Sequence, residues 1–131
     1  TISTLGNSAD FGDVLAASGG SRAVSNAVRA VHAIAYDGNP GVTNTIEYVT
    51  IATLGNAIDF GDMTITNHYS AGSCSSPTRA CIGGGNFPAR TDVIEYVQIM
   101  TQGDAVDFGN LVDDRYLMQR GCVSTGHGGL G

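Results

Sequence analysis

The stretch TIATLGNAIDFGDM at residues 50–63 decides the fold, because it occurs three times in the chain. It aligns without a gap with TISTLGNSADFGDV at residues 1–14 and with QIMTQGDAVDFGNL at residues 98–111. The three copies start 49 and then 48 residues apart. Self-similarity at a fixed spacing of this size is the signature of a repeat architecture. The sequence therefore predicts a structural unit of about 48 residues that is repeated along the chain.

Two other blocks return at nearly the same spacing. NTIEYV at 44–49 returns as DVIEYV at 92–97. SNAVRAVHAIAYDGN at 25–39 returns in shortened form as SSPTRACIGGGN at 75–86. The repeat therefore covers most of the chain and is not confined to one motif.

Each unit is expected to consist of short strands. Residues 46–51 and 94–99 alternate apolar and polar side chains, which is typical of half-buried strands. The Leu-Gly-Asn turn at 54–56 leads into a second alternating stretch, because Gly and Asn tolerate the positive φ that tight turns need. The RAVHAIAYDG and RACIGGGN blocks predict a third strand of small apolar residues. The fourth strand is the weakest in the sequence and is placed near 63–71 and 111–117.

The predicted fold class is all-β, with four-stranded repeats like propeller blades that remain open within one chain. A closed propeller needs about four blades, and the repeats amount to two whole units and part of a third. An open array exposes sheet edges, which invite pairing with another chain. We therefore expect a homo-oligomer or filament in which the end of one chain completes the partial unit of its neighbour. The predicted divisions of this single repeat array are a partial unit at 1–24, units at 25–74 and 75–122, and a C-terminal tail at 123–131.

The composition excludes several classes of protein. The chain has 131 residues, of which 19 are Gly and none is Trp or Lys, and this favours strands and turns over long helices. Its net charge is −6 and its six basic residues are all Arg, so it has no positive stripe for nucleic acid or anionic lipid. No apolar run approaches the length of about 18 residues that a membrane span requires, and no membrane insertion is expected.

The three cysteines, Cys74, Cys81 and Cys122, are an odd number and cannot form a closed framework within one chain. Cys74 and Cys81 flank the segment SSPTRA, so a disulfide across a hairpin is one interpretation. The preferred interpretation is that they are small buried apolar residues.

The residues that recur in every unit predict structure rather than chemistry. The Asp-Phe-Gly aromatics are expected to pack between sheets, and the aspartates to hold the turn by accepting hydrogen bonds from nearby backbone N–H groups. Each repeated Arg is expected to make a structural bond to a backbone carbonyl or to a carboxylate such as Glu47 or Glu95. The repeated positions are Phe11, Phe60, Phe108, Asp10, Asp59, Asp107, Arg29, Arg79, Tyr48 and Tyr96.

No catalytic, cofactor-binding or metal-ligating set is predicted. Asp-Phe-Gly is also the magnesium motif of protein kinases, but the lysine, the Gly-rich phosphate loop and the HRD sequence are missing. The aspartate pairs offer two carboxylates per turn, which are too few for calcium without carbonyls or a neighbouring chain. These pairs are Asp10/Asp13, Asp59/Asp62 and Asp104/Asp107. His32, His68 and His127 are not spaced for zinc, and nothing supplies the acid partner of a nucleophilic triad near His127.

Two sets of motifs resemble known families. A strand ending in a glycine cluster (RACIGGGN), followed by a strand with an aromatic residue (VIEYVQI), resembles kelch-type repeats. The usual Trp of the last kelch strand is absent, and Phe60 or Phe108 takes its place. The combination SSPTRA…GGGN…NTIEYVTIATLGNAIDFGD, with the ending GCVSTGHGGLG, more closely resembles the kelch-like repeats of virion structural and tail-fibre proteins of marine tailed phages, especially those infecting cyanobacteria.

This resemblance implies a non-enzymatic structural protein of the virion, such as a tail-fibre, tail-associated or decoration component. Its partners would be copies of itself or other virion proteins, and a host-surface glycan or protein. Loops on a rigid repeat scaffold tend to carry binding, so the candidate recognition residues are Asp37, Asn39, Asn86, Phe87 and Arg90. The alternatives are a subunit of a cellular extracellular filament or adhesin, located at the cell surface, and, less favoured, an enzyme on a propeller scaffold.

Overall fold

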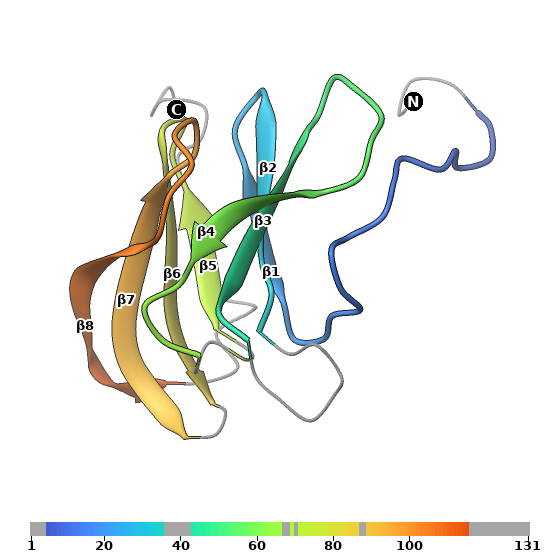
Figure 1. Ribbon diagram of the computed structural model, residues 1–131. Helices are drawn as coiled ribbons and strands as arrows, with labels where there is room; N and C mark the ends of the chain where they lie inside the picture. The colour runs from blue at the N-terminus through green and yellow to red at the C-terminus, as the bar shows by residue number, and fades with distance from the viewer. Residues whose placement is uncertain (1–4, 36–42, 67–68, 70, 87–88, 116–131) are drawn as a thin grey trace.

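The computed structural model describes residues 5–35, 43–66, 69, 71–86 and 89–115. The described part contains eight strands and no helix, so it holds no helix long and apolar enough to cross a membrane. The strands form two four-stranded antiparallel sheets, in which each strand pairs with the next one along the chain (Figure 1). The first sheet consists of β1 (Arg22–Ser25), β2 (Arg29–Ala33), β3 (Thr45–Thr50) and β4 (Ile58–Asp62). The second sheet consists of β5 (Gly72–Ser75), β6 (Arg79–Asn86), β7 (Arg90–Gln98) and β8 (Val106–Arg115).

The pairing register is equivalent in the two sheets. Tyr48 of β3 lies opposite Ile58 of β4, and Tyr96 of β7 lies opposite Val106 of β8. Both pairs of strands are irregular at the same point, immediately before the Glu of the IEYV block. The all-β class and the strands expected at 46–51 and 94–99 are therefore confirmed.

The predicted position of the fourth strand of each sheet is wrong. The additional strand of each sheet, β1 or β5, comes before the strand that begins with Arg29 or Arg79. The described residues of 63–71 form turns and irregular structure, and residues 111–115 prolong β8. β1 and β5 are only four residues long, and their sequences RAVS and GSCS carry no strong strand pattern. They form because they pair with β2 and β6, which a local pattern does not reveal. The sheets consequently begin at Arg22 and Gly72, before the predicted unit starts at 25 and 75.

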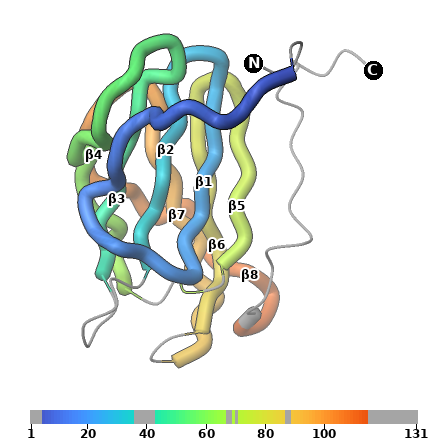
Figure 2. Tube along the Cα trace, turned by 90° about the vertical axis from the view of Figure 1, so that its right-hand side faces the viewer, coloured from blue at the N-terminus to red at the C-terminus, as the bar shows by residue number. Residues whose placement is uncertain are grey.

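The hydrophobic core lies between the two sheets. The first sheet contributes Val31, Ile46 and Phe60, and the second contributes Ile82 and Val97, all of them buried. Figure 2 shows β1 and β5 side by side, and the Ser75 hydroxyl donates a hydrogen bond to the Ser25 carbonyl, 3.1 Å away. Neither sheet therefore buries its apolar face alone; each one covers the other.

Candidate functional site: the junction between units

The Asp-Phe-Gly strand of the first sheet is bonded to the turn that precedes β8 in the second sheet. Gly103 N–H donates to the Phe60 carbonyl at 2.8 Å, and Ala105 N–H donates to the Asp62 carbonyl at 2.8 Å. In return, Asp62 N–H donates to Asp104 Oδ1 at 3.0 Å. These contacts cover the outer edge of β4, so the strand does not present its carbonyls to solvent. We call this set of contacts the second junction.

The same contacts occur a second time, between the N-terminal segment and the first sheet. Gly55 N–H donates to the Phe11 carbonyl at 2.9 Å, and Ala57 N–H donates to the Asp13 carbonyl at 2.8 Å. Asp13 N–H donates to Asn56 Oδ1 at 3.0 Å. This first junction reproduces the second one bond for bond, although its Asp-Phe-Gly segment belongs to no described strand. The contacts are therefore a property of the repeated sequence and do not depend on a complete sheet.

The glycine of Asp-Phe-Gly is required by this close approach. Gly12 and Gly61 have φ of 144° and 143°, a region that side chains rarely tolerate. A Cβ at Gly12 would lie 2.3 Å from the Gly55 carbonyl oxygen, and one at Gly61 would lie 2.5 Å from the Gly103 carbonyl oxygen. Both the backbone conformation and the contact thus exclude any other residue without rearrangement.

A buried glutamate reinforces each junction. Glu47 and Glu95 are 1% exposed. Glu47 Oε2 accepts the Leu15 N–H at 2.7 Å, and Glu95 Oε1 accepts the Thr64 N–H at 2.8 Å. Glu47 Oε1 also lies 2.5 Å from His32 Nδ1. A buried carboxylate is costly unless it is hydrogen-bonded, so these bonds offset its desolvation.

The glutamates are functional residues that the sequence reasoning assigned to a different role. They were considered as partners for the repeated arginines. The one signal available was an acidic residue at the same position of two otherwise apolar strands, but the strand pattern does not show which segment packs against it.

The arginines face the opposite side of the sheets. The Arg29 guanidinium lies over the Tyr48 ring, 4.0 Å from its centroid, and its Nη1 donates to the Ile99 carbonyl at 2.9 Å. The Arg79 guanidinium lies 4.4 Å from the centroid of the Tyr96 ring. The predicted bond to a backbone carbonyl is confirmed for Arg29, whereas the suggested pairing with Glu47 is wrong. Both arginines add a cation–π contact, which had not been predicted.

The three Asp-Phe-Gly aromatics differ in burial. Phe60 is 3% exposed, Phe11 is 37% exposed and Phe108 is 56% exposed. Phe60 contacts Tyr48 edge to face with centroids 5.9 Å apart, and Phe108 contacts Tyr96 in the same way, also at 5.9 Å. The prediction that these aromatics pack between sheets is confirmed for Phe60 alone. Phe108 is exposed because, in the part of the chain that the structure describes, no further sheet packs on the outward face of the second sheet.

The turn-holding role expected of the aspartates is confirmed where the structure gives the bond. Asp10 Oδ1 accepts the Gly12 N–H at 3.1 Å, and Asp107 Oδ1 accepts the Gly109 N–H at 2.9 Å. Asp59 is exposed in β4, where its backbone carbonyl accepts a bond from the side chain of Gln102 at 2.8 Å. Within 5–35, 43–66, 69, 71–86 and 89–115, no group of three or more His, Cys, Asp or Glu residues is arranged to hold a metal ion.

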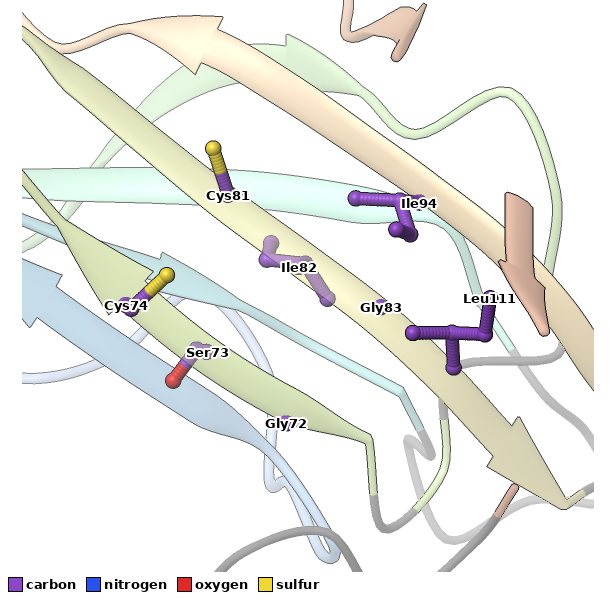
Figure 3. A pocket seen from close by; sticks show the side chains of 8 residues that line it. All are labelled: Gly72, Ser73, Cys74, Cys81, Ile82, Gly83, Ile94 and Leu111. Carbon is purple, nitrogen blue, oxygen red and sulfur yellow. The ribbon is translucent and has the colours of Figure 1, made fainter. Parts of the chain in front are cut away.

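The outward face of the second sheet carries an apolar groove. Cys81, Ile94 and Leu111 line it, together with Cys74 (Figure 3). Cys74 and Cys81 lie directly opposite each other on β5 and β6 and are free thiols, so the hairpin placement is confirmed and the disulfide is not formed. Burial raises the pKa of both thiols. Cys122 lies outside the described residues.

The groove corresponds to the core of the first sheet. Within the repeat, its lining residues match Val24, Val31, Ile46 and Met63, which form or contact the buried cluster between the sheets. The same positions are therefore core in one sheet and surface in the other, because the first sheet is covered by the second.

The candidate recognition residues do not form a described site. Asp37, Asn39 and Phe87 lie outside the described residues. Asn86 and Arg90 are at the ends of β6 and β7, where they pair with each other. Comparison with known proteins yields neither a matching family model nor a matching curated sequence.

Proposed function

We propose that the chain is a non-enzymatic structural protein of a phage virion, acting as a tail-fibre, tail-associated or decoration component through assembly and host-surface recognition. We also propose that its sheets are propeller-type blades of the kelch-like kind. The resemblance of the repeat blocks to phage proteins supports the virion role. The sequential four-stranded order of each sheet and the face-to-face packing of the two sheets support the blade type.

The observation that carries the structural role is the repeated junction. Its bonds are made twice by equivalent donors and acceptors, and the groove on the second sheet presents residues equivalent to those that form or contact the core of the first sheet. Repeat proteins gain stability from contacts between neighbouring units, and such contacts are suited to building extended surfaces.

The experiment is immunogold electron microscopy with an antiserum raised against the purified chain. Virus particles and host cells from the source culture are labelled side by side, with pre-immune serum as the control. Label on particles supports the proposal, and its place on the particle distinguishes tail from capsid. Label on filaments at the cell surface, with none on particles, would replace the proposal by the extracellular filament or adhesin.

A further inference from the structure

Gly109 is the third glycine of the Asp-Phe-Gly repeat, and it lacks the contact that the other two make. Its φ of 138° matches that of Gly12 and Gly61, but a Cβ built there would meet nothing within 4 Å. Among the described residues outside the β7–β8 ladder, no backbone N–H reaches the carbonyl of Phe108 or Asn110. The equivalent carbonyls, of Phe60 and Asp62, are both bonded at the second junction. One half of a third junction is therefore present on β8, and the described residues do not supply its other half in place.

The other half lies at the opposite side of the molecule. The turn at 5–8 is the third copy of the turns that are hydrogen-bonded to β4 and to the Phe11 segment. Its Leu-Gly-Asn sequence is identical to that at 54–56. It is exposed, and a Cβ at Gly6 would meet nothing within 4 Å. In Figure 1 the N-terminal segment and β8 flank the two sheets on opposite sides. A single chain in this conformation therefore does not join its own halves.

We propose that the turn at 5–8 of one copy docks on β8 of a second copy and completes this third junction. Gly6 N–H would donate to the Phe108 carbonyl, and Ser8 N–H to the Asn110 carbonyl. Asn110 N–H would donate to Asn7 Oδ1. This inference deepens the proposed structural function and rests on it, because it names the partner of the assembly as a second copy of the chain.

The side chains at these positions suit a contact between chains. Asn110 replaces the aspartate found at position 62, so the bond to Asn7 forms without bringing another carboxylate into the contact between two chains that each carry a net charge of −6. Phe108 is 56% exposed, whereas Phe11, whose segment already carries a docked turn, is 37% exposed, so docking of the turn covers part of this side chain.

The contact joins two different surfaces of the chain, so it is heterologous. A pair of copies joined in this way still has one free turn and one free β8. Repetition of the contact gives a closed ring if the rotation between copies closes, and an open filament if it does not.

Two variants, one on each half, test the contact by sedimentation velocity across a concentration series. Phe108→Ser removes an exposed aromatic from β8. Its control is Val106→Ser on the same strand, because Val106 is 52% exposed and its equivalent Ile58 remains 52% exposed in the sheet that is covered. We expect Phe108→Ser to weaken association by about tenfold or more, and Val106→Ser to leave it unchanged.

Gly6→Val tests the turn. The single copy tolerates the side chain, since nothing lies near it, but the docked glycines Gly55 and Gly103 have φ of 153° and 149°. A β-branched residue does not adopt this conformation without strain, so Gly6→Val should also weaken association by about tenfold or more. Ala17→Val, in the same exposed segment but outside the turn, is the control.

Mixing the two variants gives the decisive result. At a concentration where the wild type associates and each variant alone is monomeric, a 1:1 mixture should form a dimer and nothing larger, because the intact β8 of Gly6→Val accepts the intact turn of Phe108→Ser. A wild-type chain that stays monomeric up to its solubility limit would overturn the inference, as would variants that associate as the wild type does. These outcomes are separate from the immunogold result: label on virions with a monomeric chain preserves the structural role and removes self-association.

Discussion

Truncation of the same aromatic in the two sheets separates the effect of burial from the effect of the aromatic pair. Phe60 and Phe108 occupy equivalent positions, and each contacts a tyrosine edge to face at a centroid distance of 5.9 Å. Phe60 is 3% exposed and Phe108 is 56% exposed. Replacement by Ala removes a similar aromatic contact from both sheets, but it leaves a buried cavity in only one of them.

The expected losses differ accordingly. Phe60→Ala should lower the free energy of unfolding by roughly 3–5 kcal/mol, as is usual for a large side chain lost from a core. Phe108→Ala should cost about 1 kcal/mol, which is the value of an aromatic pair. The difference of roughly 2–4 kcal/mol measures the contribution of the covering sheet.

Urea unfolding followed by far-UV circular dichroism gives these free energies. The protein is kept at a concentration at which sedimentation shows a single copy, because Phe108 also belongs to the proposed contact between copies. Val106→Ala is the control for loss of an exposed side chain from β8 and should change stability by less than about 0.5 kcal/mol. Equal losses for Phe60→Ala and Phe108→Ala would refute the assignment of Phe60 to the core between the sheets.

Three further predictions follow from the junctions and the thiols. Gly61→Ala should destabilise the fold more than Gly109→Ala in urea unfolding. Both substitutions strain a positive φ, but only the Cβ added at Gly61 would lie 2.5 Å from a carbonyl oxygen, so equal losses would mean that backbone strain alone acts. Glu95→Gln should cost about 1–3 kcal/mol by the same assay, because the buried carboxylate that accepts the Thr64 N–H is replaced by an amide, and an unchanged midpoint would contradict this. Burial raises the pKa of Cys74 and Cys81, so both thiols should react slowly with iodoacetamide near neutral pH. Because the thiols of the unfolded chain lose their protons first, the free energy of unfolding should fall as pH rises above about 8.5. A rise in stability there would oppose the raised pKa of the two thiols.

Most of the fold could be read from the sequence because its signals are local and occur more than once. The alternation in TIEYVT and the Leu-Gly-Asn turn place β3 and β4, and the repeat transfers both to β7 and β8. The strands β1 and β5 were missed because four small or polar residues carry no period. Their position is set by pairing with β2 and β6, which is a property of the folded sheet.

The junction could be predicted only in part. The constant Asp-Phe-Gly indicated a tight structural requirement, and the aspartate bonds to the turn follow from local geometry. The reason for the glycine lies 42 to 43 residues away, in the carbonyls of Gly55 and Gly103, and no local pattern contains it. The burial of Phe60 and the exposure of Phe108 have the same origin, since identical motifs differ only in whether a neighbouring sheet covers them.

This dependence on neighbours sets how stability is distributed in the molecule. Glu95 accepts a backbone N–H of the segment after β4, and Arg29 donates to a carbonyl of the β7–β8 turn, so the facing sides of the sheets are tied by polar bonds as well as by the core. On the outer edge of β8, the carbonyls of Phe108 and Asn110 accept no backbone N–H from the described residues outside the β7–β8 ladder. In a repeat array the energy of each interface adds to the intrinsic stability of the units. The Asn110 amide proton should therefore exchange faster than the Asp62 amide proton in a single copy, because Asp62 N–H is bonded to Asp104 Oδ1. Docking of a turn on β8 should slow the Asn110 exchange toward the Asp62 rate, which ties local stability to assembly through a hydrogen bond of the junction.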